Sequence, residues 1–279
     1  MCSTCGCSEG AKPVVTNPDK MAIAGGETPH AHHHDHMHPH DHDHEHGDGG
    51  DERAHPHQHG EDSHRTIRLE QDILAKNNRL AERNRGWFEG REIFAVNLMS
   101  SPGAGKTTLL ERTIRDLAGE MALSVIEGDQ ETLRDAERIR ATGCKVVQVN
   151  TGTGCHLDAE MLHRALRELE PPPGSVVIIE NVGNLVCPAL FDLGEGARVV
   201  IMSVTEGEDK PLKYPHMFRA AETMILSKVD LLPHLEFEVE RFLEYAHRVN
   251  PKLAFFQLSA PRGAGLDSWY AWLRRRATS

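Results

Sequence analysis

Residues 100–108 constrain the fold of this chain more than any other stretch of its sequence. They read Ser-Ser-Pro-Gly-Ala-Gly-Lys-Thr-Thr and lie between an apolar run at 93–99 and a helix-forming run at 109–114. A buried strand, a loop of small residues and a helix beginning at Gly-Lys-Thr form the context of a phosphate-binding P-loop. The sequence therefore predicts a nucleotide site here. The alternative is an ordinary glycine-rich turn between a strand and a helix.

The P-loop interpretation gives each of its residues a role. Lys106 is expected to reach the β- and γ-phosphates, and the Thr107 hydroxyl to bind Mg²⁺. One position departs from the usual motif, because Ser100 stands where its first glycine is common. The other nucleotide contacts are expected from Gly103, Ala104, Gly105 and Thr108.

Composition divides the chain near residue 65. Residues 1–65 contain 14 of the 19 histidines, and their 12 acidic against 4 basic residues account for −8 of the net charge of −11. So few large apolar residues occur there that burial cannot offset the entropy lost on ordering. We therefore predict a disordered Cys/His-rich metal-binding tail over 1–65 and a P-loop GTPase domain over 66–279.

The remaining charge and hydropathy argue against two classes of partner. The domain at 66–279 is nearly neutral and has no basic stripe for nucleic acid. No apolar run approaches the roughly 20 residues that span a bilayer, and the first residues do not form a secretory signal. We therefore expect a cytoplasmic protein that binds neither nucleic acid nor membrane, with cysteines that bind metal rather than form disulfides.

The tail contains two kinds of metal ligand. Cys2, Cys5 and Cys7 form Cys-x-x-Cys-x-Cys, whose thiolates can converge on one metal ion. Residues 30–46 alternate histidine with acidic residues, which suits loose, multi-site binding of Ni²⁺, Cu²⁺ or Zn²⁺. The alternatives are a redox-sensitive flexible tail for the cysteines and a purification tag or inert linker for the histidines.

Hydrophobic periodicity predicts the architecture of the rest. Residues 66–85 have the pattern of an amphipathic helix, and near-continuous apolar strands alternate with helices from residue 92 onward. This alternation predicts an α/β fold with a mostly parallel sheet flanked by helices on both faces. Such sheets bind ligands beyond the carboxyl ends of their strands.

Residues 227–230, Ser-Lys-Val-Asp, directly follow a predicted strand and indicate guanine rather than adenine. The Asp230 carboxylate can accept both N1–H and N2–H₂ of guanine, and the Lys228 stem can lie along the base. Ser259 and Ala260 follow the next strand and are expected to offer a backbone N–H to guanine O6. Ser227 replaces the usual asparagine, which weakens the signal by one polar contact.

Two acidic residues at strand ends complete the predicted catalytic set with Lys106. A P-loop enzyme needs a carboxylate near Mg²⁺ and a group that orients the attacking water. Asp129 is the candidate for the first role, and Glu180-x-x-Gly183 is the candidate γ-phosphate sensor. The alternative for both carboxylates is a strand-end side chain that caps the next element.

Cys155, His156 and Cys187 form a third predicted site. They follow two different strands, and a doubly wound sheet brings such loops to one edge. Two thiolates and an imidazole suit Zn²⁺ or Ni²⁺. The alternative is a pair of small buried thiols beside a helix-capping histidine, and Cys144 is predicted to be structural.

Together these motifs resemble the family of hydrogenase nickel-incorporation GTPases, HypB. The resemblance covers nearly the whole chain. It rests on Cys2-x-x-Cys5-Gly6-Cys7, the histidine-rich segment, the P-loop, Glu127-Gly128-Asp129, Gly154-Cys155-His156-Leu157-Asp158, Glu180-Asn-Val-Gly183-Asn-Leu-Val-Cys187-Pro188 and Ser227-Lys-Val-Asp230. Urease accessory GTPases, a related group, typically have a proline between the Cys and His that are adjacent here.

Membership in that family would imply more than the residues themselves indicate. The fold would be similar to that of the dimer-forming P-loop GTPases related to signal-recognition particle and MinD-type proteins. Cys155, His156 and Cys187 would form a metal site shared across a homodimer, and Cys2, Cys5 and Cys7 a separate nickel site. Slow hydrolysis of GTP to GDP would help insert nickel into the [NiFe]-hydrogenase large-subunit precursor, together with a small zinc-containing HypA-like protein.

Three other functions stay open on the sequence alone. The first is a nickel storage or buffer protein with a vestigial GTPase, and the second is a urease-type nickel accessory GTPase. The third is a P-loop kinase acting on a small molecule, which would have no need of Cys155 or Cys187.

Overall fold

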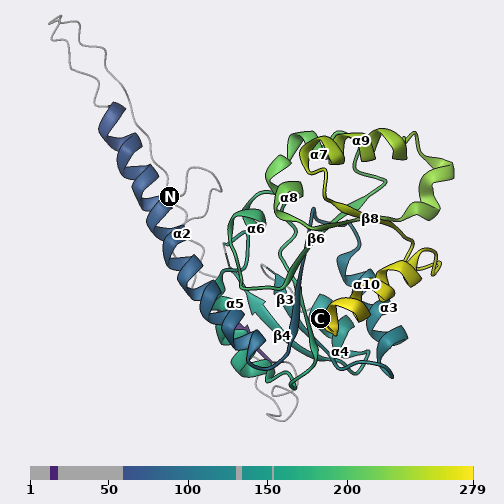
Figure 1. Cartoon of the computed structure of the whole chain (residues 1–279), viewed down its shortest axis with the longest axis horizontal. Coiled ribbons are helices and arrows are strands. Elements are labelled where there is room, and N and C mark those ends of the chain that lie inside the picture. The colour runs from purple at the N-terminus through teal and green to yellow at the C-terminus, as the bar shows by residue number, and fades with distance from the viewer. Residues whose placement is uncertain (1–12, 18–58, 130–133, 153, 279) are drawn as a thin grey trace, which may run out of the picture.

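The computed structural model describes residues 13–17, 59–129, 134–152 and 154–278. Within these ranges one eight-stranded sheet crosses the molecule, with helices on both faces (Figure 1). The strand order is β1-β4-β3-β5-β2-β6-β7-β8, and every neighbouring pair is parallel except β1 with β4. The mostly parallel sheet predicted from the sequence is confirmed.

Strands and helices alternate along the chain from β2 onward, as hydrophobic periodicity predicts. The strands are β1 (Val14–Thr16), β2 (Phe94–Ser100), β3 (Leu123–Asp129), β4 (Lys145–Asn150), β5 (Val176–Glu180), β6 (Ala197–Ser203), β7 (Thr223–Ser227) and β8 (Ala254–Gln257). The described helices are α2 (His59–Glu89), α3 (Lys106–Leu117), α4 (Arg134–Arg140), α5 (Ala159–Leu169), α6 (Cys187–Leu190), α7 (Lys210–Lys213), α8 (Pro215–Ala220), α9 (Val239–Val249) and α10 (Leu266–Ala277), with a 3₁₀ helix η1 (Val229–His234).

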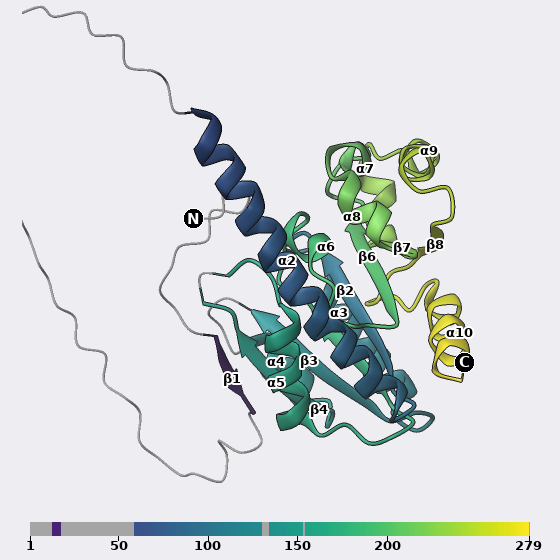
Figure 2. The ribbon, with the colours of Figure 1, turned by 60° about the vertical axis from the view of Figure 1, so that its left-hand side comes forward.

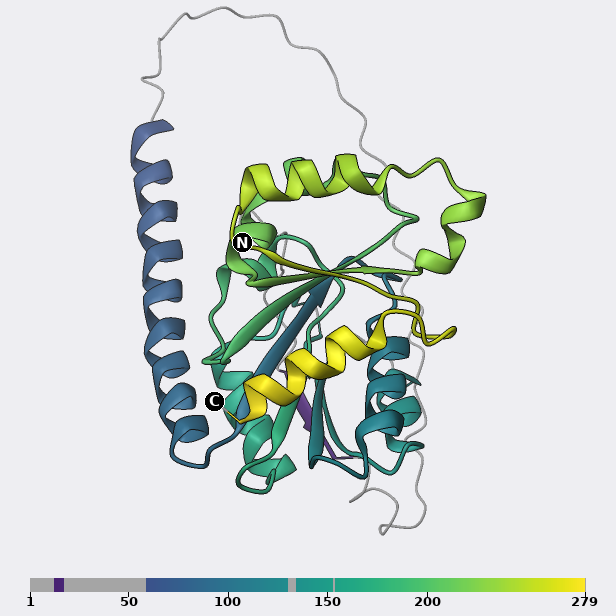
Figure 3. The same cartoon turned by 45° about the vertical axis from the view of Figure 1, so that its right-hand side comes forward.

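Different helices cover the two faces because side chains alternate along each strand. On β2, Val96 and Leu98 pack with α3, α4 and α10. Ala95 packs in a cluster with α2 and α5, and Met99 in one with α8 and α9 on the same side of the sheet. Figure 2 shows α2 lying over α5, and Figure 3 shows α3 and α10 together on the other face.

Helix α2 includes the predicted helix at 66–85 but is longer at both ends. It starts at His59, so the predicted boundary between residues 65 and 66 falls inside it, and it continues through Gly86. Its first half extends past the sheet and its covering helices (Figure 1). No described helix, α2 included, has the length and apolar character needed to cross a bilayer.

Residues 14–16 differ from the predicted disorder of the tail. Val14, Val15 and Thr16 pair antiparallel with Asn150, Val149 and Gln148 of β4. All three residues of β1 are β-branched, which favours extended backbone, and the outer edge of β4 offers unpaired backbone groups. The rest of the segment before α2, apart from residues 13 and 17, lies outside the described residues.

Candidate functional site

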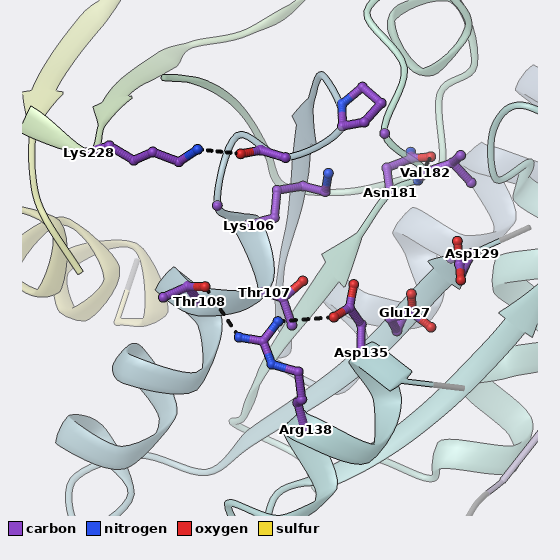
Figure 4. A pocket seen from close by; sticks show the side chains of 15 residues that line it. Lys106, Thr107, Thr108, Glu127, Asp129, Asp135, Arg138, Asn181, Val182 and Lys228 are labelled. Carbon is purple, nitrogen blue, oxygen red and sulfur yellow. Dashed lines mark hydrogen bonds and ion pairs between the residues drawn. The ribbon is translucent and has the colours of Figure 1, made fainter. Parts of the chain in front are cut away.

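The predicted P-loop borders a cavity of about 530 Å³ at the carboxyl ends of the parallel strands (Figure 4). Gly103 and Gly105 have φ values of 73° and 97°, in the left-handed region that favours glycine. Together with Lys106, Thr107 and Thr108 they line this cavity. The loop that the sequence predicts to bind phosphate therefore stands at an open, polar site.

Ser100, the residue that departs from the usual motif, holds the P-loop lysine. The Lys106 ammonium donates a hydrogen bond to Ser100 Oγ at 2.8 Å, and both side chains are buried. Burial lowers the pKa of Lys106, and the charges of Glu180 and Asp135 oppose that effect. The hydroxyl thus gives the desolvated ammonium a partner without bringing a second charge.

The residues predicted to hold Mg²⁺ and the γ-phosphate form part of the cavity wall or lie directly behind it. Asp129 and Gly183 line it, while Glu180 is buried behind Thr107 and accepts a hydrogen bond from Thr107 Oγ1 at 2.8 Å. The second oxygen of Glu180 has no hydrogen-bond partner among the described residues. One hydroxyl and two carboxylates, one of which has an unsatisfied buried oxygen, form a set of oxygen ligands that suits Mg²⁺.

Glu127 is a cavity-lining residue that the sequence analysis missed. It lies in register with Glu180 on the neighbouring strand, only 2 % exposed, and its Oε2 has no partner among the described residues. Burial, reinforced by the Glu180 and Asp129 carboxylates, raises the pKa of Glu127 to about 9. Burial also raises the pKa of Glu180 to about 7, although Lys106 and Thr107 oppose that rise. The two-residue spacing of Glu127 and Asp129, which puts both on one face of β3, is the signal that could have found it.

We predict that Glu127→Gln stabilises the nucleotide- and Mg²⁺-free protein at alkaline pH. The pKa of this carboxyl is raised on folding, so stability is lost as pH rises from the unfolded value near 4.5 toward about 9. Glutamine removes that titration. The free energy of unfolding should be nearly equal in the two proteins near pH 4 and roughly 3–5 kcal/mol higher in the variant at pH 8. Urea unfolding in EDTA measures the free energy of unfolding of each protein at each pH. A difference between the two proteins that does not change with pH would contradict the prediction. Glu244→Gln, at an exposed carboxylate of α9, is the control.

The residues predicted to bind the base border a second cavity, of about 240 Å³, on the other side of the P-loop. Lys228 and Asp230 line it together with Ala104 and Ala260. Lys228 Nζ donates to the Gly103 carbonyl at 2.7 Å, so its stem crosses the loop beside this cavity. The site therefore has a carboxylate and an apolar wall where the sequence analysis places guanine.

Two positions near the base cavity differ from the guanine-site pattern. Ser227, which replaces the usual asparagine, donates from Oγ to the Ala104 carbonyl at 2.6 Å and so ties β7 to the P-loop. The prediction that Ser259 offers its N–H to guanine needs correction, because that N–H donates to the Ala264 carbonyl at 2.9 Å. The residues after β8 fold back on themselves, which sequence spacing does not reveal. Ala260 keeps its place in the cavity wall.

Cys155, His156 and Cys187 meet as predicted. The two sulfur atoms lie 2.8 Å apart, His156 Nδ1 lies 3.6 Å from Cys155 Sγ, and one ligand atom from each residue falls within 4.8 Å of the others. Burial lowers the pKa of His156, although the charge of Asp158 opposes this effect. The lowered pKa favours the neutral imidazole, which is the form that binds metal. The His156 ring also stacks on Phe191, with centroids 3.8 Å apart.

Local structure explains how two separate loops present these ligands. The Asp158 side chain caps α5 by accepting from the Met161 N–H, which places Cys155 and His156 just before the helix. The Asn184 side chain accepts from the Cys187 N–H at 3.3 Å and fixes the start of α6. Cys144 is separate, and its thiol donates to the Leu123 carbonyl. Cys2, Cys5, Cys7 and the histidine tract at 30–46 lie outside the described residues.

Comparison with known proteins identifies the group to which these features belong. Residues 94–257 match the family described as CobW/HypB/UreG, nucleotide-binding domain. The chain is 57 % identical over 227 residues to hydrogenase maturation factor HypB of Azotobacter chroococcum mcd 1, covering 81 % of this chain and 74 % of the relative. It is 48 % identical over 284 residues to that of Escherichia coli K12, covering 98 % of each.

Solved structures agree with the sequence matches. Hydrogenase maturation factor HypB from Archaeoglobus fulgidus superposes with a TM-score of 0.69 at 39 % identity, covering 73 % of this chain and 99 % of that one. HypB from Helicobacter pylori in complex with nickel superposes with a TM-score of 0.68 at 37 % identity, covering 73 % and 95 %. The chain belongs to the HypB family of hydrogenase maturation factors, within the CobW/HypB/UreG group of nucleotide-binding proteins.

Proposed function

We propose that this chain is a nickel metallochaperone in which GTP binding and hydrolysis change the metal affinity of Cys155, His156 and Cys187. The observation that carries the proposal is that residues lining the nucleotide cavity are connected, by hydrogen bonds or by a few residues of backbone, to Cys155, His156 and Cys187. A change of nucleotide therefore has a direct route to the metal ligands.

Three hydrogen bonds connect the wall of the nucleotide cavity with the Cys155–His156 loop. The Thr151 N–H donates to the carbonyl of Asp129 at 2.9 Å, and the Thr151 hydroxyl donates to Gly154, next to Cys155. The Leu157 N–H, next to His156, donates to Asn181 Oδ1 at 3.2 Å, and Asn181 lines the cavity. A shift of either cavity residue would thus move the metal loop.

The Cys187 loop has its own link to the phosphate site. A Cβ at Gly183 would lie 3.0 Å from the backbone of Pro102 in the P-loop, so any side chain here would press on the P-loop backbone. Gly183 stands four residues before Cys187. If the Gly183 N–H contacts the γ-phosphate, losing that phosphate would let the segment relax and displace Cys187 relative to Cys155.

The hydrolytic roles follow from the same geometry. Lys106 would leave Ser100 to bind the β- and γ-phosphates, and Asp230 and Lys228 would select guanine. Mg²⁺, held by Thr107 and Asp129, would neutralise charge on the phosphates. Glu180, buried behind Thr107 and hydrogen-bonded to it, would act with Gly183 as the γ-phosphate sensor, and Asp129 lines the cavity beside them.

The wider assignments rest on the family relationship. A homodimer would share the Cys155–His156–Cys187 site, which binds Ni²⁺ or Zn²⁺, and Cys2, Cys5 and Cys7 would bind nickel separately. The partners would be a HypA-like zinc-containing protein and the [NiFe]-hydrogenase large-subunit precursor. The Helicobacter relative solved with nickel supports this choice of metal.

The decisive experiment is a nickel titration of the full chain with Cys2, Cys5 and Cys7 replaced by serine. Thiolate-to-nickel charge-transfer absorption then reports the body cysteines, because imidazoles of the tail do not give that band. We expect the nickel affinity to differ at least tenfold between the GDP complex and that with a non-hydrolysable GTP analogue, about 1.4 kcal/mol of coupling. Equal affinities would contradict the switch and favour a nickel buffer.

A further inference from the structure

Helix α2 bridges the two loops that carry the metal ligands. Asn77 and Asn84 are seven residues apart on one face of α2, and they are only 5 % and 0 % exposed. Asn77 accepts from the Ala159 N–H at 2.9 Å and donates to the Asp192 carbonyl at 2.7 Å. Asn84 donates to the Ala159 carbonyl at 2.8 Å and to the Leu193 carbonyl at 3.0 Å. Each amide therefore joins the same two segments.

Those segments are the continuations of the ligand loops. Ala159 follows His156 by three residues and is the first residue of α5. Asp192 and Leu193 follow Cys187 by five and six residues, directly after Phe191, which stacks on His156. The hydrogen bonds of Asn77 and Asn84 therefore hold backbone that is continuous with the ligand loops, and neither asparagine is hydrogen-bonded to a ligand side chain itself.

The segment that follows Cys187 packs tightly against α2 at Asp192 and Gly194. A Cβ at Gly194, whose φ is +86°, would lie 2.3 Å from the Ala81 carbonyl of α2. Arg85 forms two hydrogen bonds with the Asp192 carboxylate, at 2.8 and 3.1 Å. Because α2 is a stiff element bonded to both segments, a movement of α2 is expected to change the distance between the two loops.

We propose that Asn77 and Asn84 are positioning residues that hold the Cys155–His156 loop and the Cys187 loop at ligand distance, so that the docking of α2 sets metal affinity. The inference rests on the proposed metal-binding function of that cluster. In the sequence α2 directly follows the Cys- and His-rich segment. A partner or metal that displaces this helix would therefore change how tightly the body retains its own metal.

The test compares nickel affinities in the full chain with Cys2, Cys5 and Cys7 replaced by serine, using thiolate-to-nickel absorption in competition with a chelator. Asn84→Asp keeps the shape of the side chain, but it replaces the two donated hydrogen bonds with an acidic group that faces the Ala159 and Leu193 carbonyls. It should weaken nickel binding at least tenfold and alter the charge-transfer band. Asn77→Ala should do the same. Phe88→Leu, at a buried residue of α2 that contacts neither loop through hydrogen bonds, is the matched control for weakened helix packing.

A second measurement needs no change in α2. By linkage, if docked α2 strengthens nickel binding, bound nickel must strengthen α2 docking by the same factor. Hydrogen exchange of the Ala159 amide, which donates to Asn77, should slow about tenfold when the thiolate band is saturated. Exchange in α9, which lies elsewhere on the sheet, should not change.

The possible results distinguish failure of the proposed metal site from failure of the role proposed for α2. If the parent protein shows no thiolate-to-nickel band, both the metal site and the inference are overturned. If the parent binds nickel but Asn84→Asp binds it equally well, only the role of α2 is overturned. Equal losses in Asn84→Asp and Phe88→Leu would also overturn it, because general loosening of the helix would then explain the effect.

Discussion

Replacing Lys106 with alanine should abolish GTP hydrolysis, with a loss of at least about 100-fold in the rate. The side chain is the P-loop ammonium, held beside the phosphate cavity by Ser100. Its positive charge is expected to stabilise negative charge that develops on the transferred phosphoryl group, and because Lys106 is buried, water screens that interaction little. Release of inorganic phosphate under single-turnover conditions measures the loss.

The matched control for this prediction is Lys145→Ala, at an exposed lysine where β4 begins. It should hydrolyse GTP at the parent rate. Nickel binding in the GDP state should survive in Lys106→Ala, because the cluster of Cys155, His156 and Cys187 lies in other loops. Normal turnover of Lys106→Ala would refute the P-loop assignment. Phosphate transfer to a small molecule instead of water would identify a kinase.

Replacing Cys187 with alanine should remove the metal site of the body. The side chains of Cys155, His156 and Cys187 converge there, and if they are the three protein ligands, the loss of one should weaken nickel binding at least about 100-fold. The thiolate-to-nickel absorption should fall accordingly in the background that lacks Cys2, Cys5 and Cys7. GTP affinity should change little, since Cys187 does not line either nucleotide cavity.

Cys144→Ala is the control for Cys187→Ala. Burial raises the pKa of the Cys144 thiol to about 12, so it stays protonated, and its hydrogen bond goes to the Leu123 carbonyl. Nickel binding should be unchanged in that variant. An unaltered nickel stoichiometry in Cys187→Ala would exclude this residue as a ligand.

The sheet and much of the site could be predicted because their signals are local. The apolar run before the P-loop is β2, with six of its seven residues buried, and Asp158, which directly precedes α5, caps that helix. The meeting of Cys155 with Cys187 followed from one topological rule, that the carboxyl ends of parallel strands lie at the same edge. The rule brought the loops together without saying how they are held.

The parts that were missed depend on which distant backbone a side chain reaches. The Asn84 amide bonds to residues 75 and 109 positions away, and Asn97 to Glu195, 98 positions away. Asparagine in an amphipathic helix reads as solvent-exposed, and only the packing of α2 against the loops buries it. The N–H of Ser259 likewise donates to the carbonyl of Ala264, across a turn that residue spacing does not reveal.

The sequence by itself determined the order of strands and helices along the chain, the P-loop, the two groups of polar side chains at strand ends and the family of this chain. Each depends on residue type and spacing over a few turns or strand lengths, where backbone geometry imposes a fixed period. Only the tertiary structure decided that Glu127 and Glu180 are buried side by side and that α2 joins both ligand loops. Burial and hydrogen-bond partners depend on the packing of segments remote in the chain, and no local period encodes that packing.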